Sequence, residues 1–143
     1  MEHSEETLGG KNGIKLPMNA AQFFMRCLEN EGVKYIFGIP GEENIHMVDA
    51  FNGSSIRFIL VRHEQAASFM ADIYGRLTGH PGVCIATLGS GAINLTLGTA
   101  DANTDSVPLV AISAQVGLNR IYKESHQIVD LVACSNRSQS GPP

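Results

Sequence analysis

The chain has 143 residues, 43% of them hydrophobic, which suits one compact domain that needs no metal or disulfide to hold its core. With 10 basic against 14 acidic residues, a net charge of -4 and no basic run, neither nucleic acid nor a membrane is expected as a partner. No apolar run approaches the roughly 20 residues of a membrane span, and the acidic first six residues lack the layout of a signal or transit peptide. Three cysteines without a C-x-x-C pair predict a reduced, cytoplasmic protein.

Helices and strands are predicted to alternate along one domain over residues 17–133. Residues 1–16 are polar and contain glycines, which predicts a flexible N-terminal arm. Asn19 and Gln22 form a capping box for a first helix, and Gly32 ends it. Further helices are predicted over 43–52, 64–77 and 92–102, and strands over 33–37, 56–61, 83–88 and 107–114.

The predicted strands are apolar on both sides and are joined to helices by short glycine-rich segments. This pattern is typical of an α/β fold, doubly wound, with a mostly parallel sheet and helices on both faces. In such sheets, ligands bind beyond the carboxyl ends of the strands. We therefore expect a site among residues 38–41, 62–65, 89–91 and 114–115.

The segment Gly-Ser-Gly-Ala-Ile-Asn at residues 89–94 joins a predicted strand to a predicted helix. Free N–H groups at a helix start attract anions, and glycines let a ligand approach the backbone closely. A dinucleotide-binding fingerprint would have a third glycine where Asn94 stands. The pattern alone favours a tight turn that needs small residues over a ligand-binding loop.

Glu64 stands where a predicted strand ends and a helix begins. It could be a first-turn acid that the helix dipole favours, or a functional carboxylate at a ligand crevice, and composition does not separate these readings. A zinc-binding H-E-x-x-H motif is excluded because Ala67 stands where the second histidine would fall. His126, in a polar loop, is by itself more typical of a surface residue, and no metal site is expected in this chain.

Two motifs carry a resemblance to a known family. Residues 36–44, Ile-Phe-Gly-Ile-Pro-Gly-Glu-Glu-Asn, and residues 62–67, Arg-His-Glu-Gln-Ala-Ala, resemble the N-terminal, pyrimidine-binding domain of thiamine-diphosphate enzymes. Residues 69–79 and 100–103 extend the match. Within this superfamily the chain is most similar to acetolactate synthase large subunits, over about residues 19–133.

The resemblance implies a cofactor site for thiamine diphosphate. Glu64 matches the glutamate that hydrogen-bonds a ring nitrogen of the aminopyrimidine. A carboxyl that shares a proton with that ring favours its imino tautomer, which can take the proton from the thiazolium carbon, so Glu64 is both cofactor-binding and catalytic. Pro40 and Gly41 match the loop near the reactive carbon, and Gly91 and Asn94 match the glycine-rich loop that packs on the pyrimidine ring.

The resemblance also implies a substrate contact and shows two departures. Gln127 matches the active-site glutamine beside the substrate, with His126 next to it. For these residues and for the loop residues, structural positioning competes with a chemical role. The family usually has Gly-Pro-Gly-Ala-Thr-Asn at residues 89–94, and close relatives often have histidine where Tyr122 stands. These differences would weaken cofactor binding by the loop.

The activity implied is decarboxylation of pyruvate and joining of the two-carbon unit to a second 2-oxo acid, as in branched-chain amino acid biosynthesis. In the family a separate domain with a Gly-Asp-Gly…Asn-Asn motif holds the diphosphate and Mg²⁺, and this sequence has no such motif. The expected partner is therefore a second copy in a homo-oligomer or a chain with a diphosphate domain, and the isolated chain is expected to be inactive. No flavin is expected.

Two alternatives to this function remain. One is a subunit of another thiamine-diphosphate 2-oxo-acid decarboxylase completed in trans, and the other is a non-catalytic fragment that acts only by association.

The last ten residues, 134–143, do not follow the family. Relatives typically continue Leu-Phe-Lys-Pro-Val-Thr-Lys-Trp, and deletion of one base in the leucine codon converts this into Cys-Ser-Asn-Arg-Ser-Gln-Ser-Gly, the sequence found here. We therefore expect a frameshifted tail and a domain truncated at its C-terminus. Such a truncation would uncover apolar surface and a bare sheet edge, which predicts a marginally stable or self-associating protein.

Overall fold

The computed structural model describes residues 18–117, 119–121 and 127–139. The expected arm, 1–16, lies outside this range. None of the described helices is both long and apolar enough to cross a membrane. The elements in chain order are α1 (Ala20–Asn30), β1 (Tyr35–Gly38), η1 (Glu42–Asn44), α2 (Ile45–Asp49), η2 (Ala50–Gly53), β2 (Arg57–Leu60), α3 (Glu64–Thr78), β3 (Gly82–Ala86), α4 (Ser90–Thr104), β4 (Leu109–Ser113) and α5 (Leu131–Gln139).

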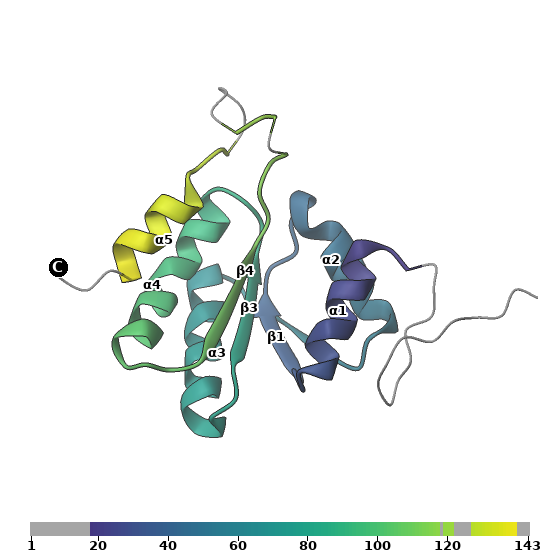
Figure 1. Ribbon diagram of the computed structural model, residues 1–143, viewed down its shortest axis with the longest axis horizontal. Helices are drawn as coiled ribbons and strands as arrows, with labels where there is room; N and C mark the ends of the chain where they lie inside the picture. The colour runs from purple at the N-terminus through teal and green to yellow at the C-terminus, as the bar shows by residue number, and fades with distance from the viewer. Residues whose placement is uncertain (1–17, 118, 122–126, 140–143) are drawn as a thin grey trace, which may run out of the picture.

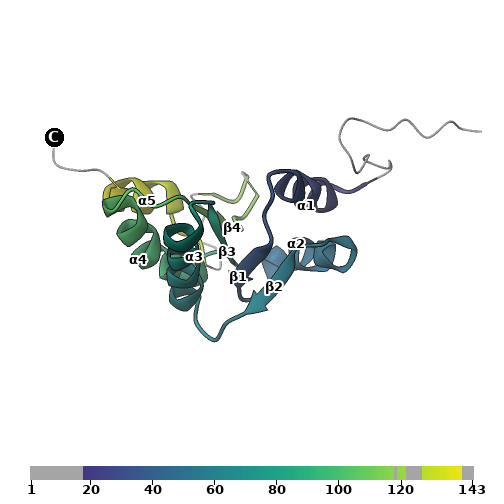
Figure 2. The same ribbon diagram turned by 90° about the horizontal axis from the view of Figure 1, so that it is seen from below.

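The four strands form one parallel sheet in the order β2-β1-β3-β4. Helices α1 and α2 cover one face, and α3, α4 and α5 cover the other (Figures 1 and 2). This confirms the predicted doubly wound α/β fold. The capping box of Asn19 and Gln22 is also present at the start of α1.

The core lies on both faces of the sheet, because successive strand residues point to opposite sides. Val83 and Ile85 of β3 pack with Met25 and Ile36 beneath α1. Cys84 of β3 packs on the other face, against α3 and α4. Burial raises the pKa of the Cys84 thiol to about 12, so this cysteine remains a neutral packing group. Because helices cover both faces of the sheet, every residue of the central strand β3 is buried and apolar.

The prediction of one continuous helix over 43–52 is wrong, because the segment divides into η1, α2 and η2. Asn44 leaves the α-helical region, with φ −108° and ψ 8°, while its side chain binds the loop before it. The segment then tightens into a 3-10 turn that ends at Gly53. The periodic apolar residues predicted the helical character but not these two interruptions.

Helix α5 was not predicted, because residues 131–139 have no strong apolar periodicity. Asp130 starts the helix: its side chain accepts the N–H of Ala133 at 2.9 Å, and its carbonyl accepts the N–H of Cys134 at 3.0 Å. The helix lies beside α4 (Figure 1). The start of the polar tail thus forms a helix on the surface of the domain.

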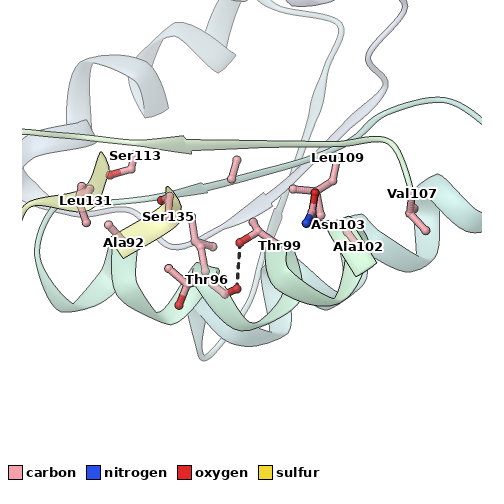
Figure 3. Close-up of a pocket in the computed structure, with 12 residues that line it drawn as sticks. Ala92, Thr96, Thr99, Ala102, Asn103, Val107, Leu109, Ser113, Leu131 and Ser135 are labelled. Atoms are coloured by element: carbon pink, nitrogen blue, oxygen red, sulfur yellow. Dashed lines mark hydrogen bonds between the residues drawn. The ribbon is translucent and has the colours of Figure 1, made fainter. Parts of the chain in front are cut away.

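Strand β4 lies at one end of the sheet and, within the described part of the chain, pairs with β3 alone. A cavity of about 390 Å³ lies between β4, α4 and α5 (Figure 3). Leu109, Ala111 and Ser113 line it from the strand, and Thr96 and Thr99 line it from α4. Within the described residues the outer edge of β4 therefore has no neighbouring strand, and the cavity lies on the face of β4 that α4 and α5 cover.

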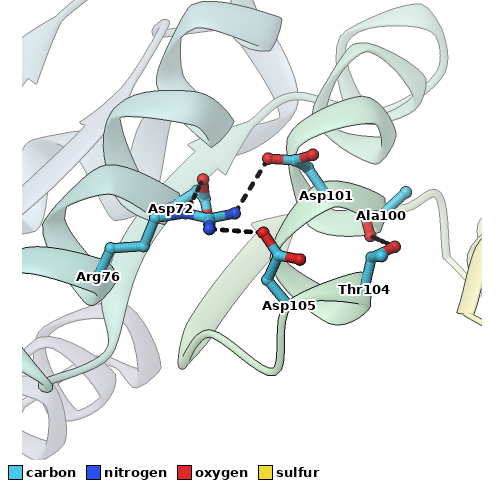
Figure 4. Close-up of polar contacts among 6 residues, drawn as sticks. All are labelled: Asp72, Arg76, Ala100, Asp101, Thr104 and Asp105. Carbon is cyan, nitrogen blue, oxygen red and sulfur yellow. Dashed lines mark hydrogen bonds and ion pairs between the residues drawn. The ribbon is translucent and has the colours of Figure 1, made fainter.

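Arg76 of α3 binds three aspartates, and two of them, Asp101 and Asp105, connect it to α4 and its C-terminal end (Figure 4). Its guanidinium binds the buried Asp72 at 2.9 Å, Asp101 at 3.1 Å and Asp105 at 2.6 Å. Hydrogen bonds to Asp72 and Asp105 raise the pKa of Arg76, so it stays charged. Oδ1 of Asp72 has no hydrogen-bond partner within the described residues. The hydrogen bond from Arg76, together with its positive charge, therefore offsets the cost of burying this carboxylate.

Glu29, near the end of α1, connects that helix to the segment before β2. Its carboxylate accepts hydrogen bonds from the backbone of Ser55 and the hydroxyls of Ser54 and Ser55, and it pairs with Arg26 at 2.7 Å. Burial alone would raise the pKa of Glu29, but these hydrogen bonds outweigh it and lower the pKa from 4.5 to about 2.

We expect Glu29→Gln to lower the free energy of unfolding at neutral pH by about 2 kcal/mol, since several hydrogen bonds to a charged acceptor are weakened. Because the folded pKa is depressed, the stabilisation is present above pH 4.5 and is lost as the pH falls toward 2. Urea denaturation of both proteins across this range measures it. A difference that does not shrink in acid would contradict the role of the charge.

Candidate active site at the carboxyl edge of the sheet

Glu64 is the first residue of α3 and follows the carboxyl end of β2. His63 caps the helix, and its Nδ1 accepts the N–H of Gln65 at 3.2 Å. The half-buried Glu64 carboxylate reaches α4, where its Oε2 accepts a hydrogen bond from Asn94 Nδ2 at 3.0 Å. Residues 30 positions apart in sequence are thus joined at the starts of two neighbouring helices.

Gly91 lies close to the other carboxylate oxygen. A Cβ atom at this position would lie 3.2 Å from Glu64 Oε1 and 3.1 Å from Thr87 Cγ2. In the described part of the chain no hydrogen bond reaches Glu64 Oε1. One oxygen of this carboxylate is therefore fixed by Asn94, and the other lies beside the Gly91 backbone with no hydrogen-bond partner among the described residues.

The turn into α4 needs glycine for a conformational reason as well. Gly89 has φ 63° and ψ −127°, a backbone conformation that residues with side chains rarely adopt. The tight turn predicted for residues 89–94 is present, and the same turn places Gly91 and Asn94 against Glu64. The two interpretations of this segment are thus compatible.

Asn44 holds the loop that follows β1, which contains Pro40 and Gly41. Its Oδ1 accepts the N–H of Gly41 at 2.7 Å, and its Nδ2 donates to the carbonyl of Ile39 at 3.2 Å. Asn44 is only 3% exposed, so water cannot readily replace these bonds. It fixes the course of the backbone around Pro40, which is itself exposed.

Thr87, directly after β3, lies between the two glycine-containing loops. A Cβ atom at Gly41 would fall 2.6 Å from the Cβ of Thr87, and one at Gly91 would meet the Thr87 methyl group as described above. Gly41 and Gly91 therefore both lie close to the Thr87 side chain. Thr87 sets the separation between the loop after β1 and the loop after β3.

Gln127 is brought to the same edge of the sheet. A Cβ atom at Gly89 would lie 2.6 Å from the Cβ of Gln127, so the two backbones are in close contact. Gln127 has a φ of 56°, in the left-handed region that residues other than glycine occupy at some cost. His126 and Tyr122, also singled out from the sequence, lie outside the described residues.

Asn44 and Thr87 are the site residues that sequence reasoning missed. Asn44 belongs to the motif at 36–44, and an asparagine three residues after a glycine loop is a recognisable capping signal. Thr87 was assigned to a strand predicted over 83–88, whereas β3 ends at Ala86. Among the described residues, no group of three or more His, Cys, Asp or Glu side chains is placed to hold a metal ion.

The chain is similar to several known proteins. Residues 18–134 match a family model described as thiamine pyrophosphate enzyme, N-terminal TPP binding domain. The chain is 44% identical over 118 residues to the acetolactate synthase isozyme 2 large subunit of Escherichia coli (strain K12), covering 82% of this chain and 22% of that protein. It is 45% identical over 115 residues to an acetolactate synthase of Mycobacterium bovis, covering 80% and 19%. Chloroplastic acetolactate synthase of Arabidopsis thaliana is 44% identical over 117 residues, covering 81% and 18%. The chain thus spans about a fifth of the length of these relatives.

We expect Asn44→Ala to lower the free energy of unfolding by about 2 kcal/mol, because it leaves a buried N–H and a carbonyl without their partner. Hydrogen exchange at the Gly41 amide should accelerate by more than the global stability change explains. Asn52→Ala is the control, since Asn52 bonds Asp49 at an exposed position. Equal effects of the two substitutions on Gly41 exchange would show that Asn44 does not hold this loop.

Proposed function

The chain belongs to the thiamine pyrophosphate enzymes, as their N-terminal TPP-binding domain, and we propose that Glu64, Gly91 and Asn94 bind the aminopyrimidine ring of thiamine diphosphate. The observation that carries this proposal is the different surroundings of the two Glu64 oxygens: Asn94 holds Oε2, whereas Oε1 lies beside Gly91 and has no hydrogen-bond partner within the described part of the chain. Pro40 and Gly41 contribute the loop after β1, which also contacts Thr87.

The residues present fit a planar, nitrogen-containing ring. Gly91 has no side chain to hinder a ring that approaches Glu64 Oε1, and a Cβ there would already crowd this oxygen. The free oxygen accepts a hydrogen bond from a protonated ring nitrogen, and a charge-assisted bond of this kind is stronger than a neutral one. Asn94 prevents the carboxylate from rotating away, because its amide holds the second oxygen.

Each side chain has a definite part in this proposal. Thiamine diphosphate, when bound, supplies a carbon nucleophile that attacks the carbonyl group of 2-oxo acids. Glu64 Oε1 and the ring nitrogen would share one proton between them, which makes Glu64 the catalytic acid–base group. Asn94 orients Glu64, and Asn44 fixes the loop of Pro40 and Gly41. We assign Gln127 to the substrate side, because it lies against Gly89 at the same edge.

For the whole protein we propose the activity named for its relatives, the synthesis of acetolactate, by decarboxylation of pyruvate and carboligation to a second 2-oxo acid. Because the chain spans about a fifth of those proteins, the diphosphate group and Mg²⁺ would be held by a domain outside these residues. That domain would be carried by a second copy of a longer, whole protein or by a separate chain, and the isolated 143 residues would be inactive. A cytoplasmic site of action suits the cysteines, since Cys27, Cys84 and Cys134 are all unpaired.

We expect Glu64→Gln to weaken binding of thiamine by about tenfold, because it replaces a charged acceptor by a neutral one. Chemical-shift titration with thiamine, followed at the Gly91, Asn94 and Gly41 amides, measures the affinity. An analogue with carbon in place of the ring nitrogen should bind the unaltered chain as weakly as thiamine binds the variant. Glu43→Gln, at an exposed position, is the matched control for the loss of charge. Equal thiamine affinity of the chain and its Glu64→Gln variant would contradict the proposal.

Completion in trans has a separate test. The chain would be mixed with a full-length acetolactate synthase whose own cofactor glutamate has been replaced by glutamine. Formation of acetolactate from pyruvate should appear with this chain and not with its Glu64→Gln variant. No activity on mixing, together with normal thiamine binding, would reject completion in trans and leave the assignment of Glu64 intact.

A further inference from the structure

His63 lies where the chain passes from the sheet to the helix that begins with Glu64. The connection from β2 to α3 consists of Val61, Arg62 and His63. The N–H of Val61 still bonds the carbonyl of Gly38 at 3.1 Å, which ties this residue to β1. Arg62 is exposed, and His63 comes directly before the first turn of α3. The place of Glu64 relative to the sheet therefore depends on the contacts of His63.

His63 holds the first turn of α3 with its backbone and with its side chain. Its carbonyl accepts the N–H groups of Ala66 at 3.0 Å and of Ala67 at 3.4 Å. Its Nδ1 accepts the N–H of Gln65 at 3.2 Å, in the turn where α-helices leave donors without an intrahelical partner. A ring nitrogen that accepts a hydrogen bond carries no proton, so this imidazole is neutral with its proton on Nε2.

Glu64 is held at both ends. Its Oε2 accepts the bond from Asn94 at 3.0 Å, which fixes the end of the side chain. The bond from Gln65 to Nδ1 of His63 encloses Glu64, because Glu64 is the residue between the donor and the acceptor. Such a closed turn of side chain and backbone restricts the dihedral angles of the enclosed residue. The direction in which the carboxylate points from α3 therefore depends on both bonds.

We infer that His63 is a positioning residue of this site: its neutral imidazole holds the backbone of Glu64 so that Oε1 stays beside Gly91. The inference rests on the function proposed for Glu64. The N–H of Gln65 occupies Nδ1, so His63 acts through Glu64 and takes no proton from the ligand at this nitrogen. Helices more often have Asn, Asp, Ser or Thr as their cap, as α1 has Asn19.

The cap can be observed in the 143-residue chain without a ligand. Nuclear magnetic resonance should show a scalar coupling across the hydrogen bond between the Gln65 amide nitrogen and Nδ1 of His63. Removal of the cap should accelerate hydrogen exchange at the Gln65 and Ala66 amides about fivefold, the factor that loss of a typical helix cap represents. A His63 ring with its proton on Nδ1 would overturn the inference.

Two substitutions separate the roles of the two ring nitrogens. In His63→Asn, Oδ1 takes the place of Nδ1 and can accept the N–H of Gln65. In His63→Gln, the amide takes the place of Nε2 and lies too far along the side chain to do so. We expect His63→Asn to bind thiamine as the unaltered chain does, and His63→Gln to bind it about threefold more weakly, since loss of the cap loosens the turn that holds Glu64.

The same chemical-shift titration at the Gly91 and Asn94 amides measures these affinities. The reverse order, with His63→Gln unaffected and His63→Asn weakened, would show that Nε2 contacts the ligand directly and would overturn the positioning role. Equal affinity of both variants and the unaltered chain would also overturn it.

A matched control separates positioning from overall stability. Asn19→Ala removes the same kind of cap from α1, on the other face of the sheet (Figure 1). It should destabilise the chain and leave the affinity for thiamine unchanged. If Asn19→Ala weakened thiamine binding as much as His63→Gln, the effect at His63 would be one of stability alone, and the inference would be wrong.

Glu64→Gln distinguishes a failure of this inference from a failure of the proposed function. Weaker thiamine binding by Glu64→Gln, together with unchanged binding by His63→Gln, rejects only the role of His63. Unchanged binding by Glu64→Gln rejects the function proposed for Glu64, and the role of His63 with it. The inference predicts that both variants bind more weakly and that Glu64→Gln has the larger effect.

Discussion

The close approach of α3 to α4 is the constraint on which the site depends. Gly98 of α4 packs against Ser68 of α3 so tightly that a Cβ at position 98 would overlap the serine. At the far end of the pair, Arg76 binds Asp101 and Asp105 of α4 while it neutralises the buried Asp72 of its own helix. With these two contacts fixed, the helix starts lie close enough for Glu64 and Asn94 to form their hydrogen bond. A wider helix pair would separate the carboxylate from the amide that orients it.

The topology of the sheet assembles the remaining parts of the site. The chain passes from β1 to β2 on one side and returns to β3 on the other, so β1 lies between the two strands whose ends carry Glu64 and Gly89. Such a change of direction opens a crevice at the carboxyl ends of parallel strands. Here the loop of Gly41 meets Thr87 at that point. Residues from three loops thus converge without any long segment having to cross the sheet.

Much of this could be predicted because the signals are local. The capping box at Asn19 and the continuous apolar run of β3 each specify an element within a few residues. The carboxyl edge of the sheet followed from the alternation of helices and strands, which placed Glu64 and the glycine loop at one site. The motifs at 36–44 and 62–67 added a family and a ligand that spacing alone left open.

What could not be predicted depends on contacts between distant residues. Sequence left two readings of Glu64 open, and its bond to Asn94 spans 30 positions. Thr87 was missed because its contacts with Gly41 and Gly91 arise only when two loops meet. Helix α5 depends on the cap formed by Asp130 and on the surface of α4, neither of which appears as periodicity in a polar segment.

The most direct test of the account is a measurement of intermolecular nuclear Overhauser effects in the chain saturated with thiamine. The account predicts contacts from hydrogens of the pyrimidine ring to the Hα atoms of Gly91 and to the Asn94 side-chain amide, and both should weaken in Glu64→Gln at a thiamine concentration that leaves the variant partly unbound. Contacts instead to Thr99 and Leu109, in the cavity beside β4, would place the ligand elsewhere and contradict the assignment of Glu64.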